Sequence, residues 1–146
     1  MKIVAMIPAR MGSKRVKAKN LRLIKGRPLI DFVLQTISKL DVFNEVYINS
    51  EDVVFENIAK KYGFKFYKRD EKLSSDTSTN DEFAYDFLKN VSCDVLVQVL
   101  PTSPFLSLQD INEFTKRICK DDIETLISVE HKQIACVYKG QALNFD

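Results

Sequence analysis

The chain opens with a short apolar run that is followed at once by a strongly basic segment. The run Ile3 to Ile7 is typical of a buried β-strand, and Pro8 ends it. Five cations follow between Arg10 and Lys19, around a Gly12-Ser13 pair whose small side chains leave backbone N–H groups accessible to an anion. Arginine and lysine around such a loop favour phosphate. We therefore expect a nucleotide site at the carboxyl end of the first strand of an α/β sheet.

Two common phosphate-binding motifs are missing from the sequence. The loop of P-loop NTPases has a glycine, four residues and then Gly-Lys-Ser/Thr, and no glycine stands five positions before Gly12. The four glycines of the chain are also too far apart to form the G-x-G-x-x-G dinucleotide motif. The sequence therefore excludes both of these classes of nucleotide site.

The positive charge is concentrated at one end of the chain. Nine of the 22 cations lie in residues 1–30, which contain no acid. The rest of the chain contains the other 13 cations and all 20 acids. This asymmetry predicts one anion site and not a basic surface, so no nucleic-acid partner is expected. A solvated basic loop is the alternative interpretation. It is disfavoured because the cations directly follow a buried strand and flank the Gly-Ser pair.

Apolar periodicity predicts alternating strands and helices along the chain. The expected strands are residues 3–7, 45–49, 64–67, 94–100, 125–129 and 135–138, and the expected helices are residues 28–40, 53–62, 80–88 and 108–119. This alternation predicts an α/β fold with three α/β/α layers and a mainly parallel sheet. Residues 94–100 are the most strand-like and are expected in the middle of the sheet. The long polar stretch from Lys68 to Asn80 is a candidate binding loop.

Length and composition predict a single domain inside the cell. A chain of 146 residues with 45% hydrophobic residues is long enough to bury one core. We find no secretory segment and no apolar span of about 18 residues, so no membrane partner is expected. Cys93, Cys119 and Cys136 are odd in number and widely spaced, and they are expected to be buried thiols in a reducing compartment. A cytoplasmic location follows from these expectations.

Three sequence blocks resemble a known family. The run IPARMGSKRVKAKN, residues 7–20, closely resembles the opening signature of the acylneuraminate cytidylyltransferases, which make CMP-sialic acid and related CMP-sugars. Leu73–Thr77 and Leu100–Pro104 follow in the family's order. The resemblance implies a Rossmann-like nucleotidyltransferase fold and transfer of CMP from CTP to a sialic-acid-like nonulosonic acid. Pyrophosphate is released, Mg²⁺ is the implied cofactor, and the product serves surface glycan synthesis.

Two other functions remain open at this point. One is a truncated or non-catalytic nucleotide-binding module of the same fold. The other is a nucleotidyltransferase that activates the eight-carbon acid of lipopolysaccharide, which the Lys19-Asn20 ending of the first block disfavours.

The resemblance also implies roles for individual residues. Arg10 and Lys19 are the expected catalytic residues, and the planar guanidinium of Arg10 suits bidentate contact with the phosphates. The segment Ser75–Thr77 resembles a family segment near the cytosine and ribose, with helix capping as an equal alternative. The complete expected nucleotide-binding set is Ala9, Arg10, Gly12, Ser13, Lys14, Asn20, Ser75, Asp76, Thr77 and Asn80.

The chain departs from the family pattern on the acceptor side and towards its end. The acceptor-side candidates are Leu100, Thr102 and Ser103, and Leu100 stands where the family usually has Gln. Because the leucine side chain cannot form hydrogen bonds to sugar hydroxyls, we expect an acceptor that is less polar at that point. His131 follows Glu130 as in the family, and a structural or pocket-lining role is expected for it.

Family members continue beyond the length of this chain, with a segment exchanged between subunits and two aspartates that ligate Mg²⁺. Residues 1–146 are therefore expected to form a single CTP-binding nucleotidyltransferase domain without that segment. No metal ligand is assigned in this chain. A homodimer is expected of the full-length protein.

Overall fold

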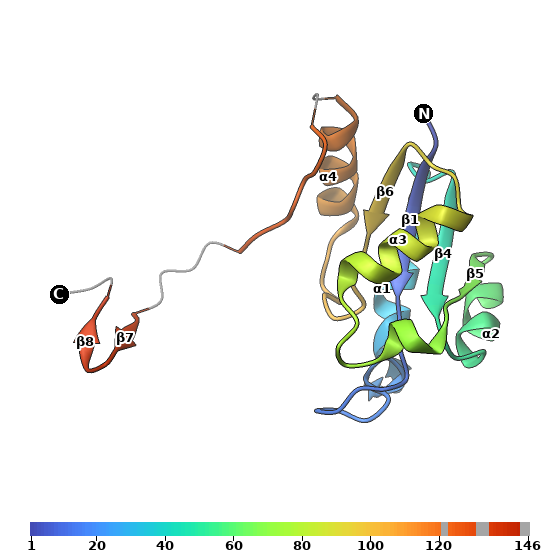
Figure 1. Cartoon of the computed structure of the whole chain (residues 1–146). Coiled ribbons are helices and arrows are strands. Elements are labelled where there is room, and N and C mark those ends of the chain that lie inside the picture. Colours follow the sequence, from blue (N-terminus) through green and yellow to red (C-terminus); the bar gives the residue numbers. More distant parts are fainter. Residues whose placement is uncertain (121–122, 131–134, 144–146) are drawn as a thin grey trace.

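A parallel four-stranded sheet forms the centre of the protein (Figure 1). The computed structural model describes residues 1–120, 123–130 and 135–143. The strand order is β5-β4-β1-β6, with β1 at Ile3–Pro8, β4 at Glu45–Ser50, β5 at Lys65–Lys68 and β6 at Val95–Gln98. Val4 lies opposite Glu45 on one side of β1, and Ile3 lies opposite Val95 on the other. Because all four strands are parallel, their carboxyl ends meet at one edge of the sheet.

Helices cover both faces of this sheet. They are α1 at Leu29–Ile37, α2 at Val54–Lys61, α3 at Asn80–Asn90 and α4 at Leu108–Lys120. In Figure 1, α3 crosses in front of the sheet and α1 lies behind it. The expected three-layer α/β/α architecture with a mainly parallel sheet is therefore confirmed.

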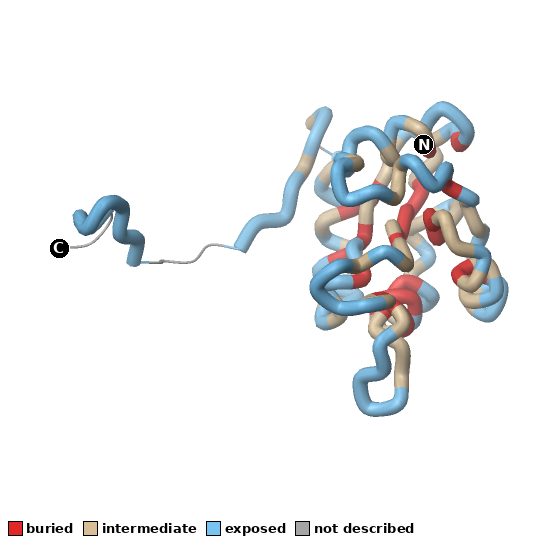
Figure 2. The backbone as a smooth tube through the Cα atoms, turned by 60° about the horizontal axis from the view of Figure 1, so that its bottom comes forward, coloured by how far each residue is buried: buried red, intermediate tan, exposed pale blue. Residues whose placement is uncertain are grey.

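The alternation of side chains along β1 explains the two helical layers. Ile7 packs in the larger core, with residues of α1, α2 and α4, whereas Val4 and Met6 pack against Phe87 of α3 on the opposite face. All three β1 side chains are fully buried. Figure 2 shows the buried residues running through the centre of the molecule. A continuous apolar run is the pattern that such a two-sided strand requires.

Short elements complete the fold. Leu23–Ile24 (β2) and Arg27–Pro28 (β3) form an antiparallel hairpin after the short 3-10 helix η1 at Lys19–Leu21. Lys25 and Gly26 connect the two strands with φ angles of 49° and 80°, which a tight hairpin turn of this hand requires. A second 3-10 helix, η2, lies at Glu71–Ser74. Val137–Tyr138 (β7) and Gln141–Ala142 (β8) form another hairpin, and all of its residues are exposed.

Two strand expectations are wrong. Residues 125–129 do not form a strand, and the expected strand at 135–138 is reduced to β7, which pairs only with β8. Consequently β6 lies at an edge of the described sheet and not in its middle. Its apolar sequence has another cause, because Val97 and Val99 are buried in the core beneath the helices. That burial does not need a second neighbouring strand.

Two further expectations concern the burial of the cysteines and the presence of a membrane-spanning helix. Cys93 and Cys119 are half-buried and Cys136 is exposed, so the expectation of three buried cysteines is wrong, most clearly for Cys136. None of the helices in the described ranges combines the length and the apolar character that a membrane crossing requires. His131 lies outside the described residues.

Candidate active site

The carboxyl end of β1 places the basic loop at the edge of the sheet. Ala9 still belongs to the core, since its side chain is fully buried and its N–H donates to the Asn49 carbonyl at 2.9 Å. Any contact from Ala9 to a ligand would therefore have to come from its carbonyl group. The next residue, Arg10, carries its side chain out of the core to the edge where open α/β sheets bind ligands.

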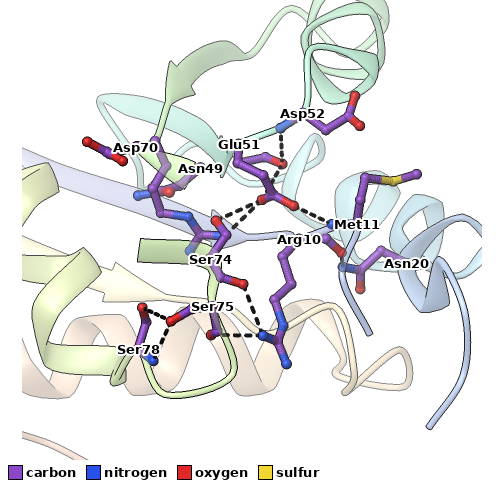
Figure 3. Close-up of polar contacts among 12 residues, drawn as sticks. Arg10, Met11, Asn20, Asn49, Glu51, Asp52, Asp70, Ser74, Ser75 and Ser78 are labelled. Carbon is purple, nitrogen blue, oxygen red and sulfur yellow. Dashed lines mark hydrogen bonds and ion pairs between the residues drawn. The ribbon is translucent and has the colours of Figure 1, made fainter. Parts of the chain in front are cut away.

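The guanidinium of Arg10 joins the basic loop to the polar loop that precedes α3. Its Nη1 donates to the carbonyls of Ser74 and Ser75 at 3.1 and 3.0 Å (Figure 3). Its Nη2 lies 3.1 Å from Asp76, whose other carboxylate oxygen lies 2.7 Å from Lys14 Nζ. The structure thus brings together four of the expected nucleotide-binding residues from two distant blocks.

Asp76 is ionised in this arrangement. The hydrogen bond from Lys14, together with the charges of Lys14 and Arg10, lowers the pKa of Asp76 below its ordinary value. The side chains of Arg10 and Asp76 are 37% and 39% exposed, so solvent weakens their ion pair. A phosphate group arriving from solvent can compete for the same two cations.

Asn20 supports the loop from inside. It lies in η1, is buried, and donates from Nδ2 to the carbonyl of Arg10 at 3.2 Å. A side-chain amide that bonds the backbone of its own loop fixes the course of that loop. Asn20 therefore holds Arg10 in place and also reaches the cavity beside it.

A cavity of about 200 Å³ lies beside Arg10. Six of the expected site residues line it, from the basic loop on one side and the segment after β6 on the other. Its lining residues are Pro8, Arg10, Ser13, Lys19, Asn20, Arg69, Phe83, Leu100, Pro101 and Thr102. The expected catalytic pair, Arg10 and Lys19, therefore shares one cavity with two expected acceptor-side residues, Leu100 and Thr102.

Sequence reasoning missed Arg69 and Phe83. Arg69 stands just beyond β5, and its side chain is only 3% exposed. Its guanidinium lies 4.8 Å from the ring centre of Phe83 and 3.3 Å from Glu51, and its Nε is buried without a hydrogen-bond partner among the described residues. Burial lowers the pKa of Arg69, although the charge of Glu51 opposes the shift. A signal was available, because Arg69 follows a strand at the same edge of the sheet as Arg10.

Several expected site residues lie elsewhere. Asn80 begins α3 and lines a separate hollow beside β6. Ser103 does not line the cavity, and its N–H donates to the Leu100 carbonyl in a turn. Thr77 bonds the hydroxyl of Ser75 at 3.1 Å. A side chain at Gly12 would meet nothing within 4 Å, so close packing does not require this glycine.

Helix capping, the alternative for Ser75–Thr77, is performed by another residue. Thr79 accepts the N–H of Glu82, and the Glu82 carboxylate accepts the N–H of Thr79 in return. This reciprocal pair caps α3. The hydroxyls of Ser75 and Thr77 are therefore not used as the cap of that helix.

The chain is similar to known proteins over most of its length. The family model described as cytidylyltransferase matches residues 4–144. The chain belongs to the cytidylyltransferase family. This cytidylyltransferase chain is 31% identical to an N-acylneuraminate cytidylyltransferase of Oncorhynchus mykiss, over 99% of this chain and 35% of that protein. It is 34% identical to the CMP-N,N'-diacetyllegionaminic acid synthase of Legionella pneumophila, over 72% of this chain and 48% of that protein.

A solved structure supports the fold of this cytidylyltransferase chain. The chain is similar to CMP:2-keto-3-deoxy-manno-octonic acid synthetase complexed with CTP, with a TM-score of 0.72 and 23% identity over 83% of this chain and 48% of the other. The curated relatives are two to three times longer than the part that this chain matches. The resemblance seen in the first sequence block is thus confirmed at the level of the family.

The described residues contain no ready-made cluster of metal-ligating side chains. No group of three or more His, Cys, Asp or Glu side chains gathers within residues 1–120, 123–130 and 135–143. The two carboxylates near the cavity are engaged with cations, Glu51 with Arg69 and Asp76 with Arg10 and Lys14. In proteins Mg²⁺ is usually held by one or two carboxylates together with waters and substrate phosphates. The cationic side chains of the site offer charge and hydrogen bonding.

Proposed function

We propose that this chain is the CTP-binding domain of an enzyme that transfers CMP from CTP to a sialic-acid-like nonulosonic acid, releasing pyrophosphate. The observation that carries the proposal is the ion-pair cluster of Arg10, Lys14 and Asp76, in which Arg10 also lines a cavity together with Lys19. The named activities of the relatives, which couple CMP to sugar acids, support the choice of substrates. The product would serve surface glycan synthesis.

The basic residues suit the phosphate half of this reaction. A hydroxyl of the sugar acid attacks the α-phosphorus of CTP, the new P–O bond forms, and the bond to the β-phosphate oxygen breaks. Negative charge then grows on the departing pyrophosphate, and preorganised cations stabilise it. Arg10 presents a planar donor fork, and Lys14 and Lys19 present point charges. These three side chains are our candidates for the charge-stabilising role.

Arg69 suits the base half. Arg69 and Phe83 both line the cavity, and Nε of Arg69 is a buried donor without a hydrogen-bond partner among the described residues. An unsatisfied buried donor costs about 1–3 kcal/mol, and a ligand acceptor that bonds it removes this cost. The exocyclic carbonyl oxygen and the ring nitrogen acceptor of cytosine fit such a donor. We assign base recognition to Arg69, beside the Ser75–Thr77 segment.

Leu100 and Thr102 suit the acceptor. Both line the cavity beyond the phosphate-binding side, and Leu100 is 45% exposed. An apolar side chain there favours an acceptor with a deoxygenated or acylated carbon at the point of contact. The Mg²⁺ requirement, the full-length homodimer and the cytoplasmic location stay predictions.

Calorimetric titration of the protein with CTP, UTP, ATP and GTP tests the proposal. Selective CTP binding is expected, and Arg10→Ala should weaken it by about tenfold or more because a charged hydrogen-bonding group is lost. Arg22→Ala is the matched control, since Arg22 belongs to the same basic segment but does not line the cavity. Equal affinity for the four nucleotides, or CTP binding unchanged in a folded Arg10→Ala variant, would contradict the proposal.

A further inference from the structure

Glu51 contacts two segments that line the cavity, the basic loop and the end of β5, and also η2, although it does not line the cavity itself. It is the first residue after β4. Its Oε1 accepts the backbone N–H of Met11 at 2.7 Å, and its Oε2 accepts the Ser74 hydroxyl at 3.0 Å (Figure 3). The same Oε2 lies 3.3 Å from Nη2 of Arg69. One carboxylate thus joins the basic loop, η2 and the end of β5.

These contacts place Arg10 from two sides. Met11, which Glu51 holds by its N–H, is the neighbour of Arg10 in the chain. The hydroxyl of Ser74 donates to Glu51, and the backbone carbonyl of Ser74 accepts a hydrogen bond from the Arg10 guanidinium. Glu51 therefore fixes both the backbone that carries Arg10 and the segment that its guanidinium bonds, without touching Arg10 through any of these bonds.

A carboxylate suits this position better than a neutral side chain. Four donors approach it, because the Ser50 hydroxyl also lies 3.4 Å from Oε2, and a carboxylate offers only acceptor sites, about four of them. A glutamine would turn an NH₂ group towards at least one of the donors. Burial raises the pKa of Glu51, but the hydrogen bonds from backbone N–H groups and Ser74, with the charge of Arg69, outweigh burial and leave the pKa below its ordinary value. The group is therefore ionised at neutral pH.

We propose that Glu51 is a positioning residue that sets the spacing between the basic loop and η2, and so determines how Arg10 and Arg69 are presented to a nucleotide. The nature of the ligand rests on the proposed function. The joining of the three segments stands independently of it. A purely structural role predicts a uniform loss of stability, whereas positioning predicts changes confined to the cavity walls.

Glu51→Gln tests this role, with Glu45→Gln as its matched control. Glu45 is the first residue of β4, at the opposite end of the strand from Glu51, and it holds three partners, Lys2, Lys65 and Tyr47. Hydrogen–deuterium exchange is measured on peptides that cover residues 9–20 and 69–76. Faster exchange in both peptides is expected for Glu51→Gln alone, together with CTP binding weakened by about tenfold or more. The control is expected to change neither readout, even where its melting temperature falls.

The other outcomes are decisive as well. Glu51→Asp keeps the charge on a shorter side chain and should retain CTP affinity better than Glu51→Gln; equal impairment of the two overturns the role of the charge. Unchanged exchange in both peptides, or the same CTP loss in Glu45→Gln, overturns the proposal. If wild-type protein does not bind CTP, the proposed function fails while the exchange data still decide the role of Glu51. Should Glu51→Gln not fold, Ser74→Ala removes a single contact and must speed exchange in residues 69–76.

Discussion

The guanidinium of Arg10 lies 3.1 Å from the carboxylate of Asp76, and this ion pair joins the basic loop to the polar loop. Lys14 contacts the same carboxylate at 2.7 Å. Asp76 therefore holds the two cations that we assign to phosphate. Since both partners of the Arg10 pair are more than a third exposed, solvent and anions reach them. A triphosphate that binds Arg10 and Lys14 must first displace this carboxylate.

Asp76→Asn should tighten the binding of inorganic pyrophosphate by about threefold to tenfold, because the competing anion is removed and the like-charge repulsion ends. Pyrophosphate is the chosen probe since it lacks the ribose that Asp76 is proposed to contact. Calorimetry at low ionic strength gives the affinity, and added salt should reduce the difference.

Asp81→Asn is the control for charge alone, because Asp81 is an exposed carboxylate in the first turn of α3. The same tightening in both variants would attribute the effect to net charge. An unchanged affinity in Asp76→Asn would show that Asp76 does not compete with phosphate.

Glu45 predicts a pH dependence of stability. The hydrogen bond from Lys65, with those from Tyr47 and Lys2, lowers the pKa of Glu45 from 4.5 to about 2. A group whose pKa is lower in the folded state stabilises the protein above its unfolded pKa and loses this contribution as the pH falls. Glu45→Gln should therefore lower the melting temperature by a few degrees at pH 7, and by progressively less as the pH falls below 4.5 towards 2.

Thermal unfolding of the wild type and Glu45→Gln across pH 7 to 3 checks this. Asp41→Asn serves as the control, because Asp41 is an exposed carboxylate that lies four residues before Glu45 in the chain. A melting-temperature difference that stays constant over the whole pH range would show that the ionised form of Glu45 is not what stabilises the fold.

Local signals were sufficient for the centre of the fold. The unbroken apolar run from Ile3 and its end at Pro8 defined β1 correctly, because burial on both faces imposes an apolar composition on consecutive residues. The cations that follow lie in a loop at the carboxyl end of this strand, as expected. The start of the helix at Asn80 was also predicted correctly from the sequence. Each of these features depends on residues close together in the chain.

The remaining features depend on residues that are distant in the sequence. Arg69 looks like any cation of a polar loop until Phe83 of α3 and Glu51 after β4 enclose it. Residues 125–129 carry a strand-like pattern, yet pairing needs a neighbouring edge in register, and no local pattern specifies that edge. Asn80 shows the same limit, because the direction of α3 decided which hollow it lines.

Leu100 predicts the acceptor preference of the full-length enzyme. Leu100→Gln adds a hydrogen-bonding group to the cavity wall and should shift the ratio of kcat/KM towards a more hydroxylated sugar acid by about tenfold. Affinity for CTP should not change. Competition between two nonulosonic acids that differ in one hydroxyl gives the ratio directly.

Leu108→Gln is the comparison for this change, since Leu108 is similarly exposed at the start of α4 but does not line the cavity. If the wild type, Leu100→Gln and Leu108→Gln all show the same acceptor preference, Leu100 does not face the sugar.

We predict that Arg69 contributes to recognition of the base but not to binding of the phosphates. Arg69→Lys keeps a cation beside Glu51 but removes Nε, the buried donor that has no partner within the described structure, and the planar contact with Phe83. CTP affinity should fall by about tenfold or more, and the preference for CTP over UTP should shrink. Pyrophosphate affinity should remain unchanged, because Arg10, Lys14 and Lys19 are intact. Arg22→Lys is the control, and an equal loss of CTP and pyrophosphate affinity in Arg69→Lys would place Arg69 on the phosphate side instead.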